Sequence, residues 1–123
     1  MRVEDDTTVW WGTWTECAVA ISRLKREGRW GEVSEERTRA ALDALATNRL
    51  EVEPVDDLRM LAMFISKGHP LKTADTLQLA AALRWREGAT ADASFVCLDD
   101  RLRRAATEEG FHVLPEPPDE EET

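Results

Sequence analysis

The sequence predicts an α/β fold of three layers, in which helices cover both faces of a small parallel sheet. Segments of strand length alternate with helical segments along the chain, an order typical of a parallel sheet. The strand segments are also continuously apolar, as expected where helices cover both faces. At 123 residues, 42% of them hydrophobic, the chain has enough apolar material for one core of ordinary size.

The chain is predicted to open with a buried strand and a helix joined by almost no loop. Residues 8–11 are β-branched or aromatic, and this strand ends at Gly12. Thr13 and Glu16 then fit the T-x-x-E capping box that begins a helix. The apolar spacing continues to Gly28, where the helix is expected to stop.

A second helix, a short strand and a third helix follow. Ser34 can cap the second helix, which is expected to end near residue 48. Residues 50–55 alternate enough to form a strand. Apolar residues then recur at i, i+3, i+4 and i+7 from Leu58, which defines an amphipathic helix closed by Gly68.

The last part of the chain contains the most apolar helix and two further strands. Residues 73–87 leave almost no polar face, so this helix should be buried on several sides. Residues 94–98 form a continuous apolar strand, and a short helix runs from there to Gly110. Residues 111–114 are the last predicted strand, which Pro115 stops.

Composition and charge favour one domain at residues 1–115 with an acidic, disordered tail at residues 116–123. The net charge of −9 argues against general nucleic-acid coating, because such binding rests on Lys and Arg neutralising phosphates. Part of that charge is local, since without the five acids of the tail it would be −4. These acids are Glu116, Asp119, Glu120, Glu121 and Glu122. The remaining, mildly acidic domain would need a metal or a local basic patch to approach a nucleic acid.

Neither a membrane protein nor a zinc protein is expected. No apolar run approaches the roughly 20 residues needed to cross a bilayer, and the N-terminus lacks the order of a secretory signal, so a cytoplasmic protein is predicted. Cys17 and Cys97 lie in apolar segments without a second Cys or His at ligand spacing. We expect both to be reduced core residues.

Three acids occupy the places where parallel sheets gather functional groups, beyond the carboxyl ends of strands and at the starts of helices. Glu16 follows the first strand, Asp75 lies in the first turn of the most apolar helix, and Asp99 directly follows the strand 94–98. Clustered carboxylates repel one another unless a hard cation such as Mg²⁺ or Mn²⁺ neutralises them. The pattern therefore favours a divalent-metal site formed by these three acids.

Each acid also has a purely structural explanation. Glu16 would complete the capping box with Thr13, Asp75 would favour the positive end of its helix dipole, and Asp99 would cap the helix that follows. Asp100 fits a helix cap better than Asp99 does, which makes it the less suitable metal ligand of the two. Both readings stay open at this point.

Three segments resemble PIN-domain nucleases, most closely the VapC-type toxins of bacterial toxin–antitoxin pairs. Residues 69–83, HPLKTADTLQLAAAL, resemble the family segment L-x-A-A-D-A-L-x-L-A-A-A. Residues 95–102, FVCLDDRL, resemble F-V-T-x-D-x-R-L, and residues 15–17 resemble the end of S-x-x-T-x-x-E. The segments occur in the family's order and span nearly the whole chain.

The resemblance implies an endoribonuclease that depends on Mg²⁺ or Mn²⁺ and cleaves single-stranded RNA. Carried over position by position, Glu16, Asp75 and Asp99 become the catalytic and metal-binding residues. A cognate antitoxin protein is the implied partner, and a homodimer is expected.

Two positions depart from the family pattern. Cys97 stands where the family often has Thr or Ser. PIN domains also open with a strand that carries an Asp in a D-T/S-S motif, followed by a helix, and the chain resembles a PIN domain without this first βα unit. Asp5 and Asp6 lie too close to Glu16 to leave room for that helix, and we expect them to lie in a solvated loop.

These departures leave a second hypothesis open, in which the chain is a non-catalytic PIN-like remnant that serves as a binding or dimerisation module. Five arginines, if they share a face, are the best candidate for an RNA-facing patch, although helix pairing could equally explain some of them. They are Arg84, Arg86, Arg101, Arg103 and Arg104.

Overall fold

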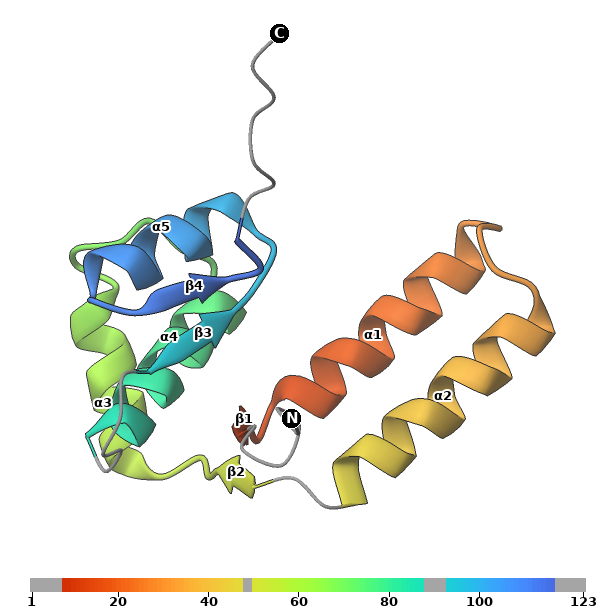
Figure 1. Cartoon of the computed structure of the whole chain (residues 1–123), viewed down its shortest axis with the longest axis horizontal. Coiled ribbons are helices and arrows are strands. Elements are labelled where there is room, and N and C mark those ends of the chain that lie inside the picture. Colours follow the sequence, from red (N-terminus) through yellow and green to blue (C-terminus); the bar gives the residue numbers. More distant parts are fainter. Residues whose placement is uncertain (1–7, 48–49, 88–92, 117–123) are drawn as a thin grey trace, which may run out of the picture. The chain divides into compact units, whose positions relative to one another are not determined.

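The computed structural model describes residues 8–47, 50–87 and 93–116 of the chain, and these form a mixed α/β fold (Figure 1). Two compact units are distinguished, residues 1–54 and residues 55–123, and each is described by itself. The predicted loop at Asp5 and Asp6 lies outside the described residues, as does the acidic tail apart from Glu116.

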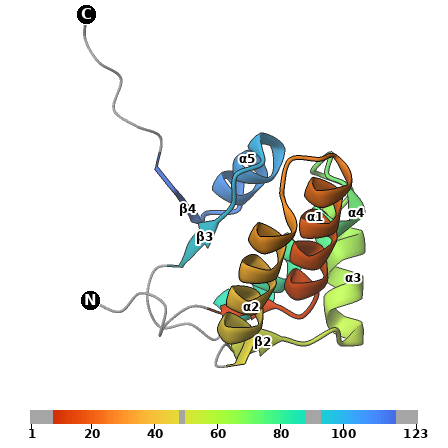
Figure 2. The ribbon, with the colours of Figure 1, turned by 90° about the vertical axis from the view of Figure 1, so that its right-hand side faces the viewer.

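The first unit contains two short parallel strands and two helices. Strand β1 (Thr8–Trp10) pairs in parallel with β2 (Leu50–Val52), and Thr8 lies opposite Leu50 in the register. Between them in sequence lie α1 (Thr13–Arg26) and α2 (Glu32–Thr47). These two helices lie side by side in both ribbon views (Figures 1 and 2).

Polar contacts connect α1 to α2. The Lys25 ammonium lies 2.8 Å from the Glu35 carboxylate, and the Arg39 guanidinium lies 2.9 Å from the same group. Arg39 also donates a hydrogen bond of 3.0 Å to the Ser22 hydroxyl. The pKa of Glu35 is lowered by its hydrogen bonds to Lys25 and Arg39. Charged and polar side chains around the half-buried Glu35 therefore connect the two helices.

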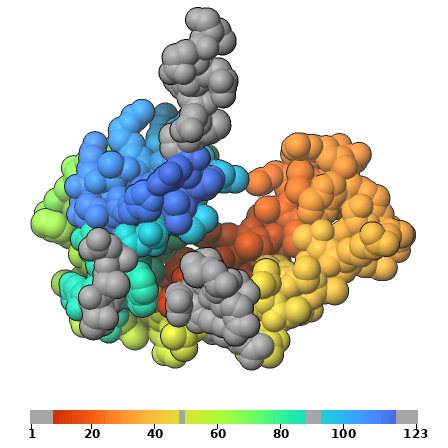
Figure 3. Space-filling view, viewed as in Figure 1, coloured from red at the N-terminus to blue at the C-terminus, as the bar shows by residue number. Residues whose placement is uncertain are grey.

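The second unit contains three helices and another pair of short parallel strands. Helix α3 (Asp56–Ile65) packs against α4 (Thr73–Arg86). Strand β3 (Ser94–Val96) pairs in parallel with β4 (His112–Leu114), and α5 (Asp100–Glu108) connects the two. Strand β4 lies at the surface of this unit beside α5 (Figure 3).

A compact apolar core fills the second unit. Its largest fully buried side chains are Leu58, Leu79 and Leu102, one from each helix. The rings of Phe95 and Phe111 lie 5.5 Å apart and join the strand pair to this core. The buried alanines of α4 and α5 allow these helices to approach their neighbours closely.

The strands that the structure describes form two separate pairs, β1 with β2 and β3 with β4. The α/β class and the parallel strand direction are confirmed. In β3, Phe95 is buried whereas Val96 is exposed, so only one face of this strand is covered. The expectation that helices would cover its apolar run on both faces is therefore not confirmed.

The predicted helix caps were wrong in several places. The residue that caps α1 is Gly12, without a side-chain hydrogen bond, so Thr13 and Glu16 do not form the predicted capping box. A Cβ atom on Gly12 would lie 2.5 Å from the Trp10 indole, which leaves room for glycine alone. Ser34 lies inside α2, which already begins at Glu32.

The glycines predicted to end helices were also only partly confirmed. Gly28 and Gly110 have φ angles of 74° and 96° and follow α1 and α5, as predicted for left-handed helix ends. Gly68 does not have a positive φ, and α3 ends earlier, at Ile65.

Candidate metal centre

Asp75 lies in the first turn of α4, the helix with the most buried surroundings. Its neighbour Thr76 is buried and closes the turn, because both its amide and its hydroxyl donate hydrogen bonds of 2.8 Å to the carbonyl of Lys72. The Asp75 side chain is half-buried. It is therefore fixed at the helix N-terminus, where a carboxylate also interacts favourably with the helix dipole.

Asp99 lies between β3 and α5 and caps that helix. Its Oδ2 accepts a hydrogen bond of 3.0 Å from the amide of Leu102. The cap fixes the position of the carboxylate and leaves Oδ1 outside that bond. The structural role foreseen for Asp99 is therefore confirmed, whereas the expectation that Asp100 is the better cap is wrong, because Asp100 is already the first helical residue.

Asp99 lies close enough to Asp75 to affect its ionisation. The pKa of Asp75 is raised, first by burial and then by the negative charge of Asp99, while Lys72 opposes the rise. Like charges that share a site disfavour ionisation of one another. A carboxyl group with a raised pKa beside a second acid is a common property of functional sites.

Cys97 lies beside the same two acids. Burial raises the pKa of its thiol to about 11; Arg103 opposes that rise, and Asp75 and Asp99 add to it. The side chain therefore remains a neutral thiol at neutral pH, which makes it a poor nucleophile and a poor metal ligand. The environment of Cys97 thus agrees with the expectation of a reduced residue, although its side chain is only half-buried.

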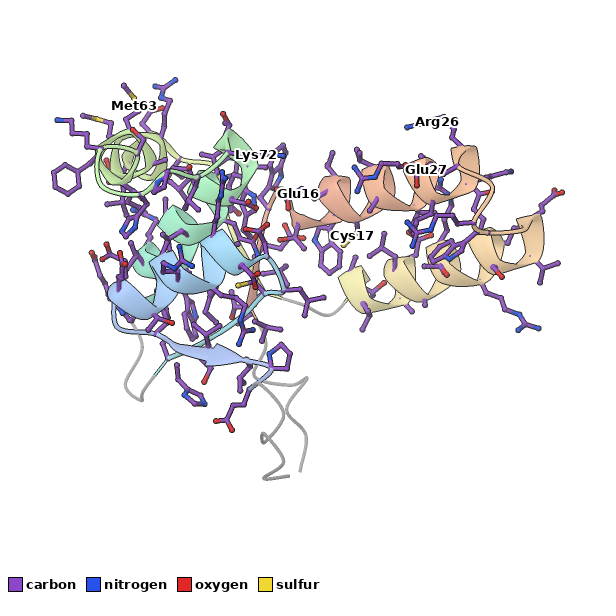
Figure 4. All side chains as sticks on the ribbon, turned by 90° about the horizontal axis from the view of Figure 1, so that it is seen from above. Glu16, Cys17, Arg26, Glu27, Met63 and Lys72 are labelled. Carbon is purple, nitrogen blue, oxygen red and sulfur yellow. The ribbon has the colours of Figure 1, made fainter. Side chains whose placement is uncertain are left out.

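Glu16 belongs to the first unit, where it lies half-buried in the first turn of α1 (Figure 4). Its amide donates a hydrogen bond of 3.1 Å to the carbonyl of Gly12. Of the three predicted site residues, the structure thus brings Asp75 and Asp99 together within one unit, and Glu16 is described with the other.

A divalent cation fits the donor set that Asp75 and Asp99 provide. Mg²⁺ prefers oxygen ligands and is usually held by one or two carboxylates, with waters and substrate phosphates completing its shell. A cation would also relieve the repulsion that raises the pKa of Asp75. Within residues 8–47, 50–87 and 93–116, no three His, Cys, Asp or Glu side chains form a group that could hold a metal ion. The pair therefore fits a partly hydrated cation rather than a closed protein cage.

Two of the five arginines proposed for RNA binding contribute to the structure of the second unit. Arg103 donates hydrogen bonds of 2.8 Å to the carbonyl of Cys97 and 2.7 Å to that of Pro115. Arg86 donates to the carbonyl of Glu109 at 2.6 Å, and its guanidinium lies 4.4 Å from the centre of the Phe111 ring. The structural explanation is therefore the better one for these two.

The other three arginines are more exposed. Arg84 lies 3.7 Å from the carboxylate of Asp57, a surface ion pair that contributes little to stability. Arg101 and Arg104 are exposed on α5. These two remain the best candidates for contacts with phosphate.

Sequence reasoning did not single out Lys72, which the structure places three residues before Asp75 at the cap of α4 (Figure 4). Its positive charge lowers the pKa of Asp75. The sequence did contain a signal for Lys72, because a cationic residue about one helical turn before a candidate metal-binding acid lies close to that acid. It suggests a group that would contact the phosphate of a bound substrate.

Comparisons of the chain with known protein families, with curated proteins and with solved structures find no match. None of the helices that the structure describes is long and apolar enough to cross a membrane.

Proposed function

We propose that the chain is a metal-dependent endoribonuclease of the PIN-domain, VapC toxin type, which hydrolyses phosphodiester bonds in single-stranded RNA. The observation that carries the proposal is that Asp99 lies near the half-buried Asp75, so that burial and then the charge of Asp99 raise the pKa of Asp75. Both residues occupy the acidic positions of the segments that resemble PIN domains. In the proposed arrangement, the strands belong to a three-layer PIN-like fold.

Asp75 and Asp99 would hold Mg²⁺ or Mn²⁺, with water completing the coordination of the cation. When bound, such a cation supplies a water of lowered pKa and offsets the charge that develops on the scissile phosphate. The chain's own residues orient the reaction: the α5 cap fixes Asp99, and the first turn of α4 fixes Asp75. Lys72 would attract the RNA backbone.

The partners follow from the same proposal. The substrate is RNA in the cytoplasm, and a cognate antitoxin protein would cover the acidic site. We expect residues 1–123 by themselves to cleave RNA weakly, because the opening Asp of the family motif has no assigned counterpart among them. Fusing a strand that carries this motif to the N-terminus should raise the cleavage rate.

The alternative is a non-catalytic PIN-like module for binding or dimerisation. A specific observation favours it: Met60, Met63 and Phe64 of α3 are all exposed, as is common at protein interfaces. A protein with this function would not need Asp75 and Asp99 to be ionised.

The test measures the effect of Mn²⁺ on the melting temperature, together with cleavage of one single-stranded RNA. A cation that binds only the folded protein raises its melting temperature by mass action. Asp75→Asn should abolish both the shift and the cleavage, since it removes a charge at nearly constant shape. Asp99→Asn should do the same while keeping a side chain that can cap α5.

Asp100→Asn is the matched control, because Asp100 is adjacent to Asp99 but lies inside the helix. It should leave the Mn²⁺ shift and the cleavage unchanged. A Mn²⁺ shift that survives Asp75→Asn would place the metal elsewhere. Cleavage that survives this substitution would come from a contaminating nuclease, and the proposal would then lose its support.

A further inference from the structure

Helix α3 has two apolar faces, of which its own unit covers one. Leu58, Ala62 and Ile65 are buried against the core. On the opposite side, Met60 is 67% exposed and Met63 is 65% exposed. Figure 4 shows Met63 pointing away from α4 and α5.

The exposed side chains form one continuous line along the helix. Asp56, Met60, Met63 and Lys67 follow one another at spacings of four, three and four residues, which places them on one face of an α-helix. Phe64, 68% exposed, lies beside this line, and the Lys67 ammonium lies 5.9 Å from the centre of its ring. We call these five residues the α3 stripe.

The α3 stripe is apolar in the middle and carries opposite charges at its two ends. Asp56 begins the helix, and Lys67 lies in the turn directly after it. Asp56 forms an ion pair of 3.1 Å with Arg59, but both side chains are largely exposed. Such a pair contributes little to stability, so the Asp56 carboxylate can exchange this partner for another cation at small cost.

The order of residues along the α3 stripe is self-complementary. Asp56 and Lys67 are equally far in sequence from the point between residues 61 and 62, and so are Met60 and Met63. When two copies of the helix lie antiparallel about a two-fold axis at this point, Asp56 of each copy meets Lys67 of the other. Met60 of each then meets Met63 of the other. In a two-fold interface each contact occurs twice, so the charges match at both ends.

We propose that the α3 stripe is a homodimer interface in which α3 packs antiparallel against α3 of a second copy of this chain. The charge pattern selects this occupant, because a stripe with both charges at matched distances complements itself. The thioether side chains of Met60 and Met63 adapt readily to an irregular contact. The proposal does not depend on the metal site and holds for an enzyme or a binding module.

The expected dimer is weak. Helix α3 has 10 residues, and one face of such a helix offers less area than the roughly 800 Å² per partner of an ordinary stable interface. We therefore expect an equilibrium between monomer and dimer that depends on concentration and becomes measurable in the micromolar range or above.

The experiment exchanges the charges at the two ends and measures self-association of the full chain by sedimentation velocity. Asp56→Lys places two cations on the α3 stripe, and Lys67→Asp places two anions there. Each variant alone should dimerise about tenfold more weakly than the wild type, because each end of the interface then holds like charges. An equimolar mixture of the two variants should associate again, since every contact between them joins opposite charges.

Renewed association in the mixture would show that each variant had lost the interface and not its fold, because the mixture contains the same two variants. Circular dichroism checks that α3 remains folded in each. A third variant that combines Met60→Ser with Met63→Ser should lose association without any change of charge. Glu36→Lys is the matched control for Asp56→Lys, since Glu36 is an exposed helical acid in the first unit, and it should leave association unchanged.

Three results would overturn the proposal. A wild-type chain that stays monomeric at the highest soluble concentration would show that this face does not bind a second copy. If neither charge substitution changes the strength of dimerisation, the interface lies elsewhere, for example at an open strand edge. Single variants that weaken association but fail to associate with each other would exclude the antiparallel arrangement.

Discussion

Residues 1–54 and residues 55–123 are stabilised by different kinds of contact. In the first unit, Trp10 and Ile21 are the buried hydrophobic residues among those described, and α2 buries none. Ion pairs around Glu35 connect its two helices instead. In the second unit, every helix contributes buried apolar side chains to one core. We infer that hydrophobic burial contributes more to the stability of the second unit than to that of the first.

The largest expected effect comes from the core of the second unit. Leu79 is 0% exposed, and Leu79→Ala should reduce the free energy of unfolding by about 2–5 kcal/mol through lost burial and a cavity. Leu45 of α2 is 47% exposed, and Leu45→Ala should cost less than about 0.5 kcal/mol. Urea denaturation monitored by circular dichroism measures both. Equal losses in the two variants would mean that the units do not differ in this way.

An intermediate effect is expected at a closely packed point of the first unit, the contact of Gly12 with Trp10. Gly12→Ala places a methyl group 2.5–2.9 Å from the buried indole of Trp10, and it should cost about 1–3 kcal/mol. Gly31→Ala is the control, because no heavy atom lies within 4 Å of the added methyl group. Thermal melts of both variants test this contrast. A Gly12→Ala variant as stable as the wild type would show that Trp10 moves freely.

The smallest expected effect concerns the pH dependence of stability, to which Asp75 and Glu35 should contribute with opposite signs. The pKa of Asp75 is raised in the folded protein, so its ionisation destabilises the fold as pH rises from its unfolded pKa of about 3.9 through the folded value. Asp75→Asn should therefore increase stability at neutral pH in the absence of metal. The gain should stay below about 1 kcal/mol after solvent screening, and it should vanish at acid pH.

Glu35 of the first unit should behave in the opposite way. Its pKa is lowered by Lys25 and Arg39, so the stability it contributes is present at neutral pH and is lost as pH falls through the folded pKa. Glu35→Gln should thus destabilise the protein at neutral pH and have no effect in acid. Urea titrations of the two variants at both pH values check the signs. Two variants with the same sign would contradict the assigned electrostatic causes.

Apolar periodicity was sufficient to predict the five described helices, and the alternation of strands with helices predicted the parallel direction of the described strands. It could not fix the helix starts, because several residues near each start can serve as caps. Asp99 rather than Asp100 caps α5, since the extended backbone after β3 continues to Asp99. Gly12 rather than Thr13 caps α1, and the Trp10 indole occupies the space that a side chain on residue 12 would need.

The candidate site was predictable only in part for a similar reason. Sequence position indicated that Asp75 and Asp99 follow a helix start and a strand end, and the structure places them near each other.

The exposure of a residue in a strand depends on the elements that cover the strand, which a local apolar run does not reveal. Trp10 and Trp11 were both expected to be buried, yet Trp11 is exposed, because β1 ends at Trp10 and Trp11 lies in the turn that follows.

The two hydrogen bonds of Arg103 affect how a genetic selection on this protein should be interpreted. One arginine joins the chain after β3 to the chain after β4, so its loss would loosen the segment that carries Asp99. If the proposed toxin activity is correct, survivors of a selection against toxicity will include Arg103 variants beside Asp75 variants. The two groups will differ in abundance, because cells remove an unfolded protein but retain a folded one that has lost a carboxylate. Immunoblots of the survivors would thus separate residues that perform the chemistry from residues that support the fold.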